Sequence, residues 1–467
     1  MSTKTSTISA EQSPLGEIRQ SNLVDPYLVT LEAHDDPQNM PALRRWIAVL
    51  VISSGALCVT AASSAAFTET GAAETFHVSH EVTILGISLF VAGLGLSSLS
   101  SGCFFGSAFL SVAGGSVTDM FAASKVANPM AVYTISPFIG PVIGPLVAGF
   151  INQNLYWRWT YRVDLCWIFL ECLLLFLLVP ETYAPVILKK KAVKLREETG
   201  DLKYYAPLDR REGSLAFAIL ISCYKPFRKL SYLEDQFTDP NEFQELLLFD
   251  RMALLLDIWN ALLLGLLYLA FQVFPMIFEE KYHFNTQMTG LSFLGLGMGM
   301  ACSSRGYSNF HIYDSFLCGR LFTRKAAEFN GDLPPEVMLI MGQAGAVLVP
   351  ISLFWLAFTT YSTVHWIVPI IASIPFGSGI YFSFASTFMY LVTAYRPIAA
   401  SAMASNSALR CGFAAAFPLF AVAMYDRLGT VGATALLAGL TTIMAPLPFI
   451  FYRIGERLRR NSPFAIN

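Results

Sequence analysis

The stretch ISPFIGPVIGPLVAGFI, residues Ile135–Ile151, decides the fold of this chain. It is apolar throughout, yet it contains two Gly-Pro pairs four residues apart and a third pair of small residues one turn further on. In water it would be a poor helix, because interior proline costs roughly 3 kcal/mol and glycine about 1 kcal/mol. In a bilayer, neighbouring helices and local backbone adjustment can satisfy the freed polar groups. The stretch therefore predicts a membrane-spanning helix.

The spacing of the small residues places them on one face of that helix, where another backbone can approach closely. The residues are Gly140, Pro141, Gly144, Pro145 and Gly149. A kinked packing face without special function would explain the spacing alone. Two Gly-Pro pairs in register favour a second interpretation, in which the helix is a packing hinge of a transport protein.

The composition agrees with a membrane protein. The 467 residues are 54% hydrophobic and only 14% charged, and the mean hydropathy is +0.52. Soluble domains carry about 25% charged residues, so this chain has too little charge to cover a soluble surface. Its formal net charge of -2 gives no reason to expect nucleic acid as a partner.

The sequence offers no motif for catalysis or for a cofactor. The eight cysteines form no CxxC pair, so neither a disulfide framework nor a zinc site is predicted. There is no GxSxG nucleophile elbow and no GxxxxGK[ST] phosphate loop. We therefore expect no metal, no cofactor and no enzymatic activity.

An all-α, polytopic architecture follows from the apolar runs. A spanning helix needs about 20 mostly apolar residues, and we count eleven candidates. These are Trp46–Phe67, Val82–Leu99, Cys103–Ala123, Met130–Ile151, Leu165–Val179, Met252–Phe278, Thr289–Ser303, Val337–Phe358, Trp366–Val392, Ile398–Tyr425 and Val431–Tyr452.

Polar segments divide these spans into two groups. Residues 1–45 predict a disordered cytosolic arm, and residues 181–250, rich in Lys and Arg, predict a cytosolic linker. We expect an incomplete helix bundle over 46–180, a six-helix bundle over 251–455 and a cytosolic tail over 456–467. Two bundles joined by a linker are typical of transporters with internal repeats.

Orientation follows from Lys and Arg near the membrane. The second half is consistent, since six spans begin and end on the basic side. The first half has five spans, which is the wrong parity for a cytosolic arm and a cytosolic linker. Either a span is missing, or one span is re-entrant, or the N-terminus lies outside, which would export Arg44 and Arg45. We place the cause of the wrong parity at Gly93–Gly106, where one span meets the next without a charged turn.

Several stretches resemble the major facilitator superfamily, in particular its fungal drug:proton antiporter branch of polyamine and multidrug exporters. The stretches are FFGSAFLSVAGGSVTDMF (Phe104–Phe121), GPVIGPLVAG (Gly140–Gly149), WRWTYRV (Trp157–Val163), HWIVPIIASIPFGSGI (His365–Ile380) and AASAMASNSALRCGFAAAFPLFAVAMYDRLG (Ala399–Gly429). The resemblance implies a two-bundle fold with eleven visible spans instead of twelve. It also implies a monomer in the plasma membrane that exports small organic molecules, cationic or lipophilic, in exchange for protons by alternating access.

The chain departs from that family at the same junction, Gly93–Gly106. The family places a loop with an acid and clustered arginines after its second span, followed by a third span, and neither is present. An arginine of the family pattern is replaced by Ser98, and an Asn/Asp segment by one containing Met389 and Thr393. A damaged gene model and a shortened protein both explain this. The alternative function is therefore a transporter-derived, inactive or truncated membrane protein.

Ionisable residues inside spans cost roughly 2.5–3.5 kcal/mol each and are functional candidates. Glu171 lies mid-span and could carry a proton or serve polar packing. Arg410, beside Asn406, could order a transport cavity, pair with a carboxylate or pack against carbonyl groups. Asp119 could act in transport or cap its helix, and for Asp257 we expect an interfacial, snorkelling position.

A cavity for organic cations would need aromatic walls. The candidates are Tyr268, Phe271, Phe274, Tyr381 and Phe382. Aromatic residues make up 13% of the chain, so filling of helix interfaces is the alternative role for each of them.

The predicted topology can be tested with a protease site inserted into the linker, residues 181–250. We expect cleavage in permeabilised cells and protection in intact cells, because the basic linker should lie in the cytosol. Cleavage of intact cells by added protease, with the N-terminus still inside, would contradict the two-bundle interpretation.

Overall fold

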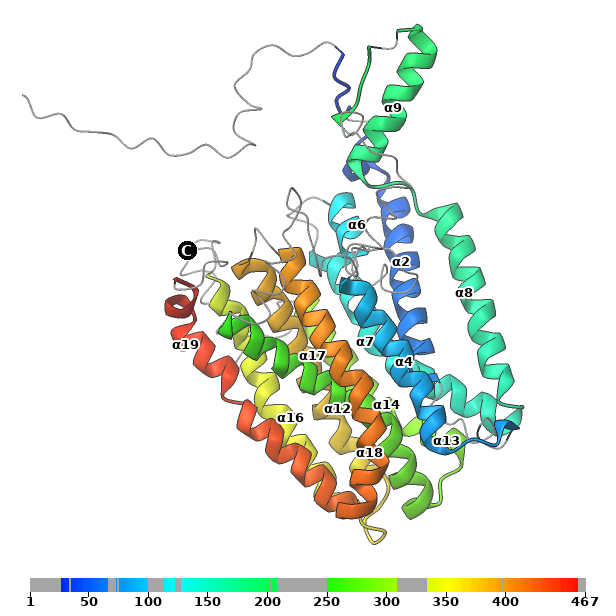
Figure 1. The fold of residues 1–467 in the computed structure, drawn as a ribbon, viewed down its shortest axis with the longest axis vertical. Helices are drawn as coiled ribbons and strands as arrows, with labels where there is room; N and C mark the ends of the chain where they lie inside the picture. Colours follow the sequence, from blue (N-terminus) through cyan, green and yellow to red (C-terminus); the bar gives the residue numbers. More distant parts are fainter. Residues whose placement is uncertain are drawn as a thin grey trace, which may run out of the picture.

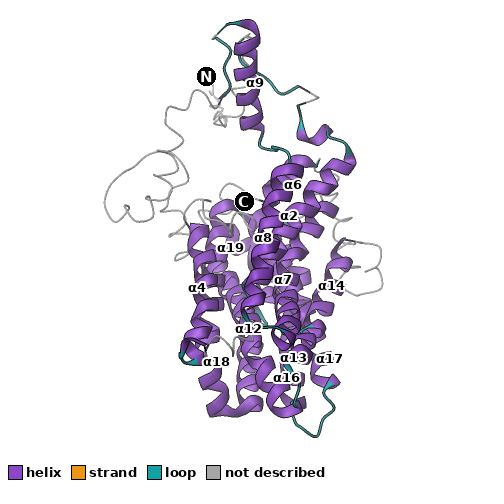
Figure 2. Ribbon diagram, turned by 90° about the vertical axis from the view of Figure 1, so that its right-hand side faces the viewer, coloured by secondary structure: helices purple, strands orange, loops and turns teal. Residues whose placement is uncertain are grey.

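A computed structural model describes residues 27–32, 35–65, 73, 75–99, 113–121, 127–201, 203–207, 250–308, 334–395 and 399–460. Over these residues the protein is built from helices (Figures 1 and 2). The extended structure among them is one isolated parallel bridge between Leu28 and Tyr205. The predicted all-α class is confirmed.

The described part of the first half contains six α-helices. They are α2 (Ala42–Ala62), α4 (His80–Leu99), α6 (Ala113–Met120), α7 (Ala127–Asn154), α8 (Arg158–Leu178) and α9 (Ala184–Thr199). The decisive stretch forms the continuous helix α7 although Pro137, Pro141 and Pro145 lie inside it. Most of the predicted span Cys103–Ala123 lies outside the described residues, apart from α6 and Phe121.

The second half contributes the remaining long helices. They are α12 (Arg251–Tyr282), α13 (Thr286–Ser292), α14 (Leu294–Ser308), α16 (Leu339–Thr359), α17 (Ile367–Ala394), α18 (Ala399–Met444) and α19 (Leu447–Arg460). Short 3-10 turns precede α2 and α16, namely η1 (Pro37–Asn39) and η5 (Pro335–Met338).

Two predicted boundaries differ from the structure. The predicted span Thr289–Ser303 is interrupted at Phe293, which separates α13 from α14. The predicted span Ile398–Tyr425 and the first part of the span Val431–Tyr452 are joined in α18, which turns at Gly429 with φ 70° and ψ 165°, and the last span continues in α19. A positive φ suits glycine, which has no Cβ to clash with the backbone. The chain can therefore reverse there without an intervening loop.

Six helices in the described part of the chain are long and apolar enough to cross a membrane. They are Ala42–Ala62, Val132–Asn154, Met252–Tyr282, Pro335–Thr359, Ile367–Ala394 and Ser405–Arg460, the last of which contains the turn at Gly429. In α4 the apolar part is shorter, Val82–Gly93. Helix α8 is long enough but carries Arg158, Arg162, Asp164 and Glu171. The count of eleven spans stays a prediction.

Helix packing brings the two halves together along α4 and α7. Helix α2 packs on α7 and α8, whereas α12 packs on α18 and α17 packs on α14 and α16. Helix α4 lies against α18, and α7 lies against α13 and α14 (Figure 1). We call the two ends of the helix bundle the α9 end and the α13 end.

The arm before α2 is ordered over the residues that the structure describes. At the α9 end, Lys191 lies 2.8 Å from Glu32 and 2.7 Å from Asp35, and Val29 packs beside Ala192. Part of the predicted disordered arm is therefore ordered, because α9 offers it both charge and apolar surface. Residues 1–26 lie outside the description.

A buried ion pair joins the start of α16 to the end of α19. Arg459 Nε donates to Glu336 Oε1 at 2.9 Å, and Arg459 Nη2 donates to Oε2 at 3.2 Å. Such a bidentate pair fixes geometry as well as charge. Its side chains are 10% and 9% exposed, so each charge depends on the other for compensation.

We expect Glu336→Gln to lower the melting temperature of the detergent-solubilised protein, because an uncompensated buried charge costs about 3–5 kcal/mol. The matched control is Glu456→Gln, which breaks the exposed Arg460–Glu456 pair and should cost about 1 kcal/mol or less. Equal melting temperatures for the two variants would contradict a stabilising role of the buried pair.

Candidate functional site

The small residues of α7 bring its backbone into contact with α2. A Cβ at Gly140 would collide with the side chain of Thr60 and lie 2.9 Å from the carbonyl oxygen of Leu57. A Cβ at Gly144 would collide with Ser64 and with the carbonyl oxygen of Ala61. The α2 backbone therefore occupies the space that any side chain at these glycines would need.

The end of α7 makes a similar contact with the second half. A Cβ at Gly149 would lie 2.8 Å from the carbonyl oxygen of Thr286 and 3.3 Å from the Cα of Gly290. One turn further on, Gln153 Oε1 accepts a hydrogen bond from the Thr286 amide at 3.2 Å. A single helix therefore packs backbone to backbone against both halves.

Aromatic side chains fill the middle of the same interface. The ring of Phe138 from α7 lies 5.7 Å from that of Tyr381 and 5.2 Å from that of Phe384, both on α17. On α12, Tyr268 lies 5.3 Å from Phe271. Such edge-to-face and tilted pairs stabilise packing beyond area burial.

The five predicted cavity residues all belong to this buried aromatic cluster. Tyr268, Phe271, Phe274, Tyr381 and Phe382 are buried and contribute to one hydrophobic core with Phe138. Tyr268 also shares a hydrogen bond of 2.7 Å with Ser63, which follows α2. Tyr268 and Tyr381 contact the first half through Ser63 and Phe138, and contact of any of the five with a substrate stays a prediction.

A carboxylate is buried between α12 and α18. Asp257 is 0% exposed; its Oδ2 accepts a hydrogen bond from Ser405 at 2.8 Å and its Oδ1 accepts one from Asn406 at 2.9 Å. The predicted interfacial position of Asp257 is therefore wrong, because α18 covers this turn of α12 and supplies two donors. The general rule that intramembrane carboxylates are functional would have identified it.

Arg410 lies on α18 one turn after Asn406. Its guanidinium stands 5.2 Å from the ring of Phe388 and 5.7 Å from that of Phe384. Its charge acts on Asp257 and also on Tyr133 of α7. The structure places Arg410 and Asn406 on one face of α18 near Asp257, and a role of Arg410 in transport stays a prediction.

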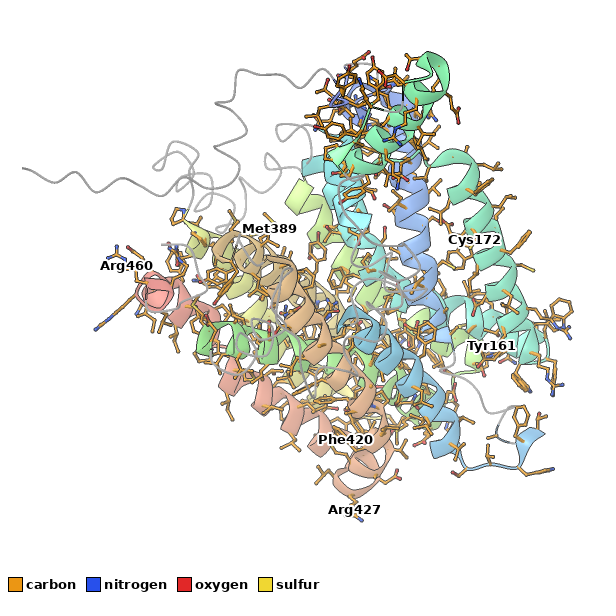
Figure 3. The ribbon with its side chains drawn as sticks, turned by 45° about the horizontal axis from the view of Figure 1, so that its top comes forward. Tyr161, Cys172, Met389, Phe420, Arg427 and Arg460 are labelled. Atoms are coloured by element: carbon orange, nitrogen blue, oxygen red, sulfur yellow. The ribbon has the colours of Figure 1, made fainter. Side chains whose placement is uncertain are left out.

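The other two predicted charges lie elsewhere. Glu171 is buried on α8, and its Oε2 accepts a hydrogen bond of 2.9 Å from Ser54 of α2. Asp119 is exposed near the end of α6. Figure 3 shows Cys172, the neighbour of Glu171, on α8 at the edge of the molecule. The structure does not bring either carboxylate to Asp257 and Arg410.

No group of three or more His, Cys, Asp or Glu side chains that could hold a metal ion occurs within the ranges described. The site therefore consists of a buried Asp–Ser–Asn cluster, an adjacent Arg and an aromatic core, all beside the interface of two helical halves. These features define a polytopic membrane transporter.

The chain belongs to the Major Facilitator Superfamily, whose family model matches residues 44–416. It is 40% identical to "Efflux pump atB" of Aspergillus terreus, over 98% of this chain and 94% of that protein. It is 37% identical to "Probable drug/proton antiporter YHK8" of Saccharomyces cerevisiae, over 93% of this chain and 88% of that protein. The predicted resemblance to the fungal drug:proton antiporter branch is confirmed.

Solved structures show the same fold. A POT family transporter crystallised with a thioalcohol-conjugated peptide matches with a TM-score of 0.53 at 10% identity, over 91% of this chain and 99% of that chain. At this identity the match shows the fold alone. The chain is a multi-pass membrane transporter with small-molecule substrates.

The alignments bear on the predicted missing span. The alignment to the yeast protein extends over 482 positions although this chain has 467 residues, so the yeast protein contains residues that this chain lacks. The alignment to the A. terreus protein extends over 467 positions and includes 98% of this chain, which leaves room for few gaps. The absence of a third family span stays a prediction.

We expect Gly144→Ala to lower the melting temperature and to reduce transport, because the Ala61 carbonyl cannot move without displacing α2. The control is Gly439→Ala on α18, where no heavy atom lies within 4 Å of the added Cβ. That change should be neutral or stabilising by up to about 1 kcal/mol. Wild-type stability and transport in Gly144→Ala would contradict the close approach of α7 and α2.

Proposed function

We propose that this protein is a proton-coupled exporter of small organic molecules that works by alternating access as a monomer in the plasma membrane. The observation that carries the proposal is the packing of α7, whose glycines contact the backbones of α2 and α13. Alternating access requires two halves that tilt against each other around a central site. At Gly149 the contact between the halves is made by backbone atoms of α7 and α13, so no side chain of α7 interlocks with the second half at that turn.

The contacts between the halves support one state of such a cycle. Along α7 they run from Phe138 through Gly149 to Gln153, toward the α13 end. Ser63 follows the C-terminal end of α2, which lies away from α9, and contacts Tyr268 of the second half. With the linker in the cytosol, the α13 end is the outer end, and this state holds the halves together on the outer side.

Export and proton coupling are supported by the relatives. The A. terreus protein is called an efflux pump and the yeast protein a probable drug/proton antiporter. A third relative, from Aspergillus fumigatus and 32% identical over 94% of this chain and 76% of its own length, is called a multidrug transporter. The aromatic core and the buried carboxylate suit lipophilic and cationic substrates.

The alternative is a transporter-derived protein without transport. It is favoured by the departure from the family pattern between the second span and the segment Phe104–Phe121, where a gate loop and a span are lacking. The A. terreus relative aligns with few gaps and is called an efflux pump, which favours transport by the shorter form.

The test uses proteoliposomes with an acidic lumen and a membrane potential clamped at zero by valinomycin and potassium. The probe is tetraphenylphosphonium, whose permanent charge excludes passive accumulation driven by pH. We expect accumulation at least tenfold above that in protein-free liposomes, because each proton that leaves drives the cation inward against its gradient.

Nigericin, which collapses the proton gradient, is the control. Accumulation that survives nigericin would contradict proton coupling. No accumulation of this cation or of a panel of neutral lipophilic compounds by a folded protein would favour the alternative, a protein without transport.

A further inference from the structure

The exporter proposed above needs a group that binds and releases the proton, and four carboxylates are buried in the described residues. Glu336 is paired with Arg459 and Asp250 caps α12, which leaves Glu171 and Asp257 as the candidates. Glu171 lies within the first half, between α8 and α2. Asp257 lies between α12 and α18, and α18 is the helix on which α4 of the first half packs. The second position is linked through α18 to α4, an element that must move relative to it when the halves tilt.

We propose that Asp257 is the proton-binding group of this transporter and that the hydrogen bonds from Ser405 and Asn406 change when it is protonated. The inference rests on the proposed function, because it assigns the coupling step to a residue. It stands on the complete burial of Asp257 and on the two hydrogen bonds that α18 donates to its carboxylate.

The hydrogen bonds fit the charged form of Asp257. Ionised carboxylates only accept hydrogen bonds, and both oxygens here accept from neutral donors, the Ser405 hydroxyl and the Asn406 amide. Neutral donors hold a carboxylate more weakly than a direct ion pair does. Protonation therefore need not break a salt bridge, which suits a group that must gain and lose its proton in every cycle.

The protonated form requires a different arrangement at Asn406. A protonated Oδ1 would donate a hydrogen bond, but it now faces the Asn406 Nδ2 group, which also donates. The Asn406 Oδ1 atom is buried and has no hydrogen-bond partner among the described residues. Rotation of the amide by half a turn would present this oxygen to the new proton. Asn406 can therefore serve both states of Asp257 through one rotation.

The charge on Arg410 connects this change to the rest of the site. Arg410 follows Asn406 by one turn, and its charge acts on Asp257 of α12 and on Tyr133 of α7. Proton binding to Asp257 removes the negative charge that balances this cation. The loss of this balance disfavours a second positive charge in the site, so protonation favours release of a cationic substrate.

The charged and titratable groups around Asp257 are few in the part of the chain that the structure describes. They are Arg410 on α18, Asp250 at the start of α12 and Tyr395 after α17. Asp250 caps the α12 amides of Met252 and Ala253, so its carboxylate is already engaged. Asn260, one turn along α12, is fully buried and its amide has no described partner. Its amide provides a hydrogen-bonding site for water beside the carboxylate.

The main test compares gradient-driven accumulation with exchange in proteoliposomes, using tetraphenylphosphonium as the probe. Asp257→Asn mimics the protonated, neutral side chain. We expect it to lose gradient-driven accumulation by at least tenfold and to retain exchange of labelled for unlabelled probe without a gradient, since exchange needs no net proton movement. Asp426→Asn changes an exposed aspartate on α18, the helix that carries Ser405 and Asn406; it is the control and should accumulate the probe like the wild type.

Several outcomes would overturn the inference. Gradient-driven accumulation by Asp257→Asn would do so, as would loss of exchange as well as accumulation in a folded variant. So would loss of coupling in Glu171→Gln while Asp257→Asn stays coupled. If the wild type itself shows no dependence on the gradient, the proposed function fails first, and the two failures are thereby distinguished.

A second variant keeps the inference testable if Asp257→Asn does not fold. Ser405→Ala removes one donor and keeps the carboxylate. Because the charged form loses a hydrogen bond, we expect the pH of half-maximal accumulation to rise by about one unit, the shift that corresponds to one hydrogen bond to a charged group. An unchanged pH profile in a folded Ser405→Ala protein would overturn the assignment of Asp257.

Discussion

The structure depends on the close approach of α7 to the backbones of its neighbours. Lipid tails are as apolar as leucine side chains, so the hydrophobic effect does not drive helices together inside a bilayer. Association relies on van der Waals contact and hydrogen bonds instead, and both need short distances. Gly140 and Gly144 give α7 that distance to α2, and Gly149 gives it to α13. Without these glycines α7 could not pack at this distance against both α2 of the first half and α13 of the second half.

The same close packing requires that each buried charge in the described residues has either an ion-pair partner or hydrogen-bond donors. A charge inside a membrane protein requires either compensation or hydrogen-bond donors. Glu336 has compensation from Arg459 at the α9 end, and this ion pair holds α16 and α19 together. Asp257 has donors instead, from Ser405 and Asn406. The first arrangement suits a permanent contact, and the second suits a group whose charge changes.

Prediction from sequence succeeded where a local pattern had one physical cause. The double Gly-Pro pattern predicted a membrane helix with a small-residue face, and α7 is that helix. The order of motifs predicted the family, which the family model confirms. It failed for Asp257, because nearness to the start of an apolar run was taken as nearness to the membrane surface. Its burial comes from α18, a neighbour that a pattern within one segment does not reveal.

The sequence by itself determined that the helices lie in lipid, that the fold is all-helical and which family the chain belongs to. These properties follow from hydropathy and glycine spacing, which act within a single segment. Only the tertiary structure decided which charges meet. Asp257 and Ser405 are separated by 148 residues and lie 2.8 Å apart, whereas Glu171 is engaged by Ser54 on a different pair of helices. The sequence leaves such pairings open, because which faces of two helices meet depends on the packing of all the others. A carboxylate acquires its role from the donors that the neighbouring helix brings to it.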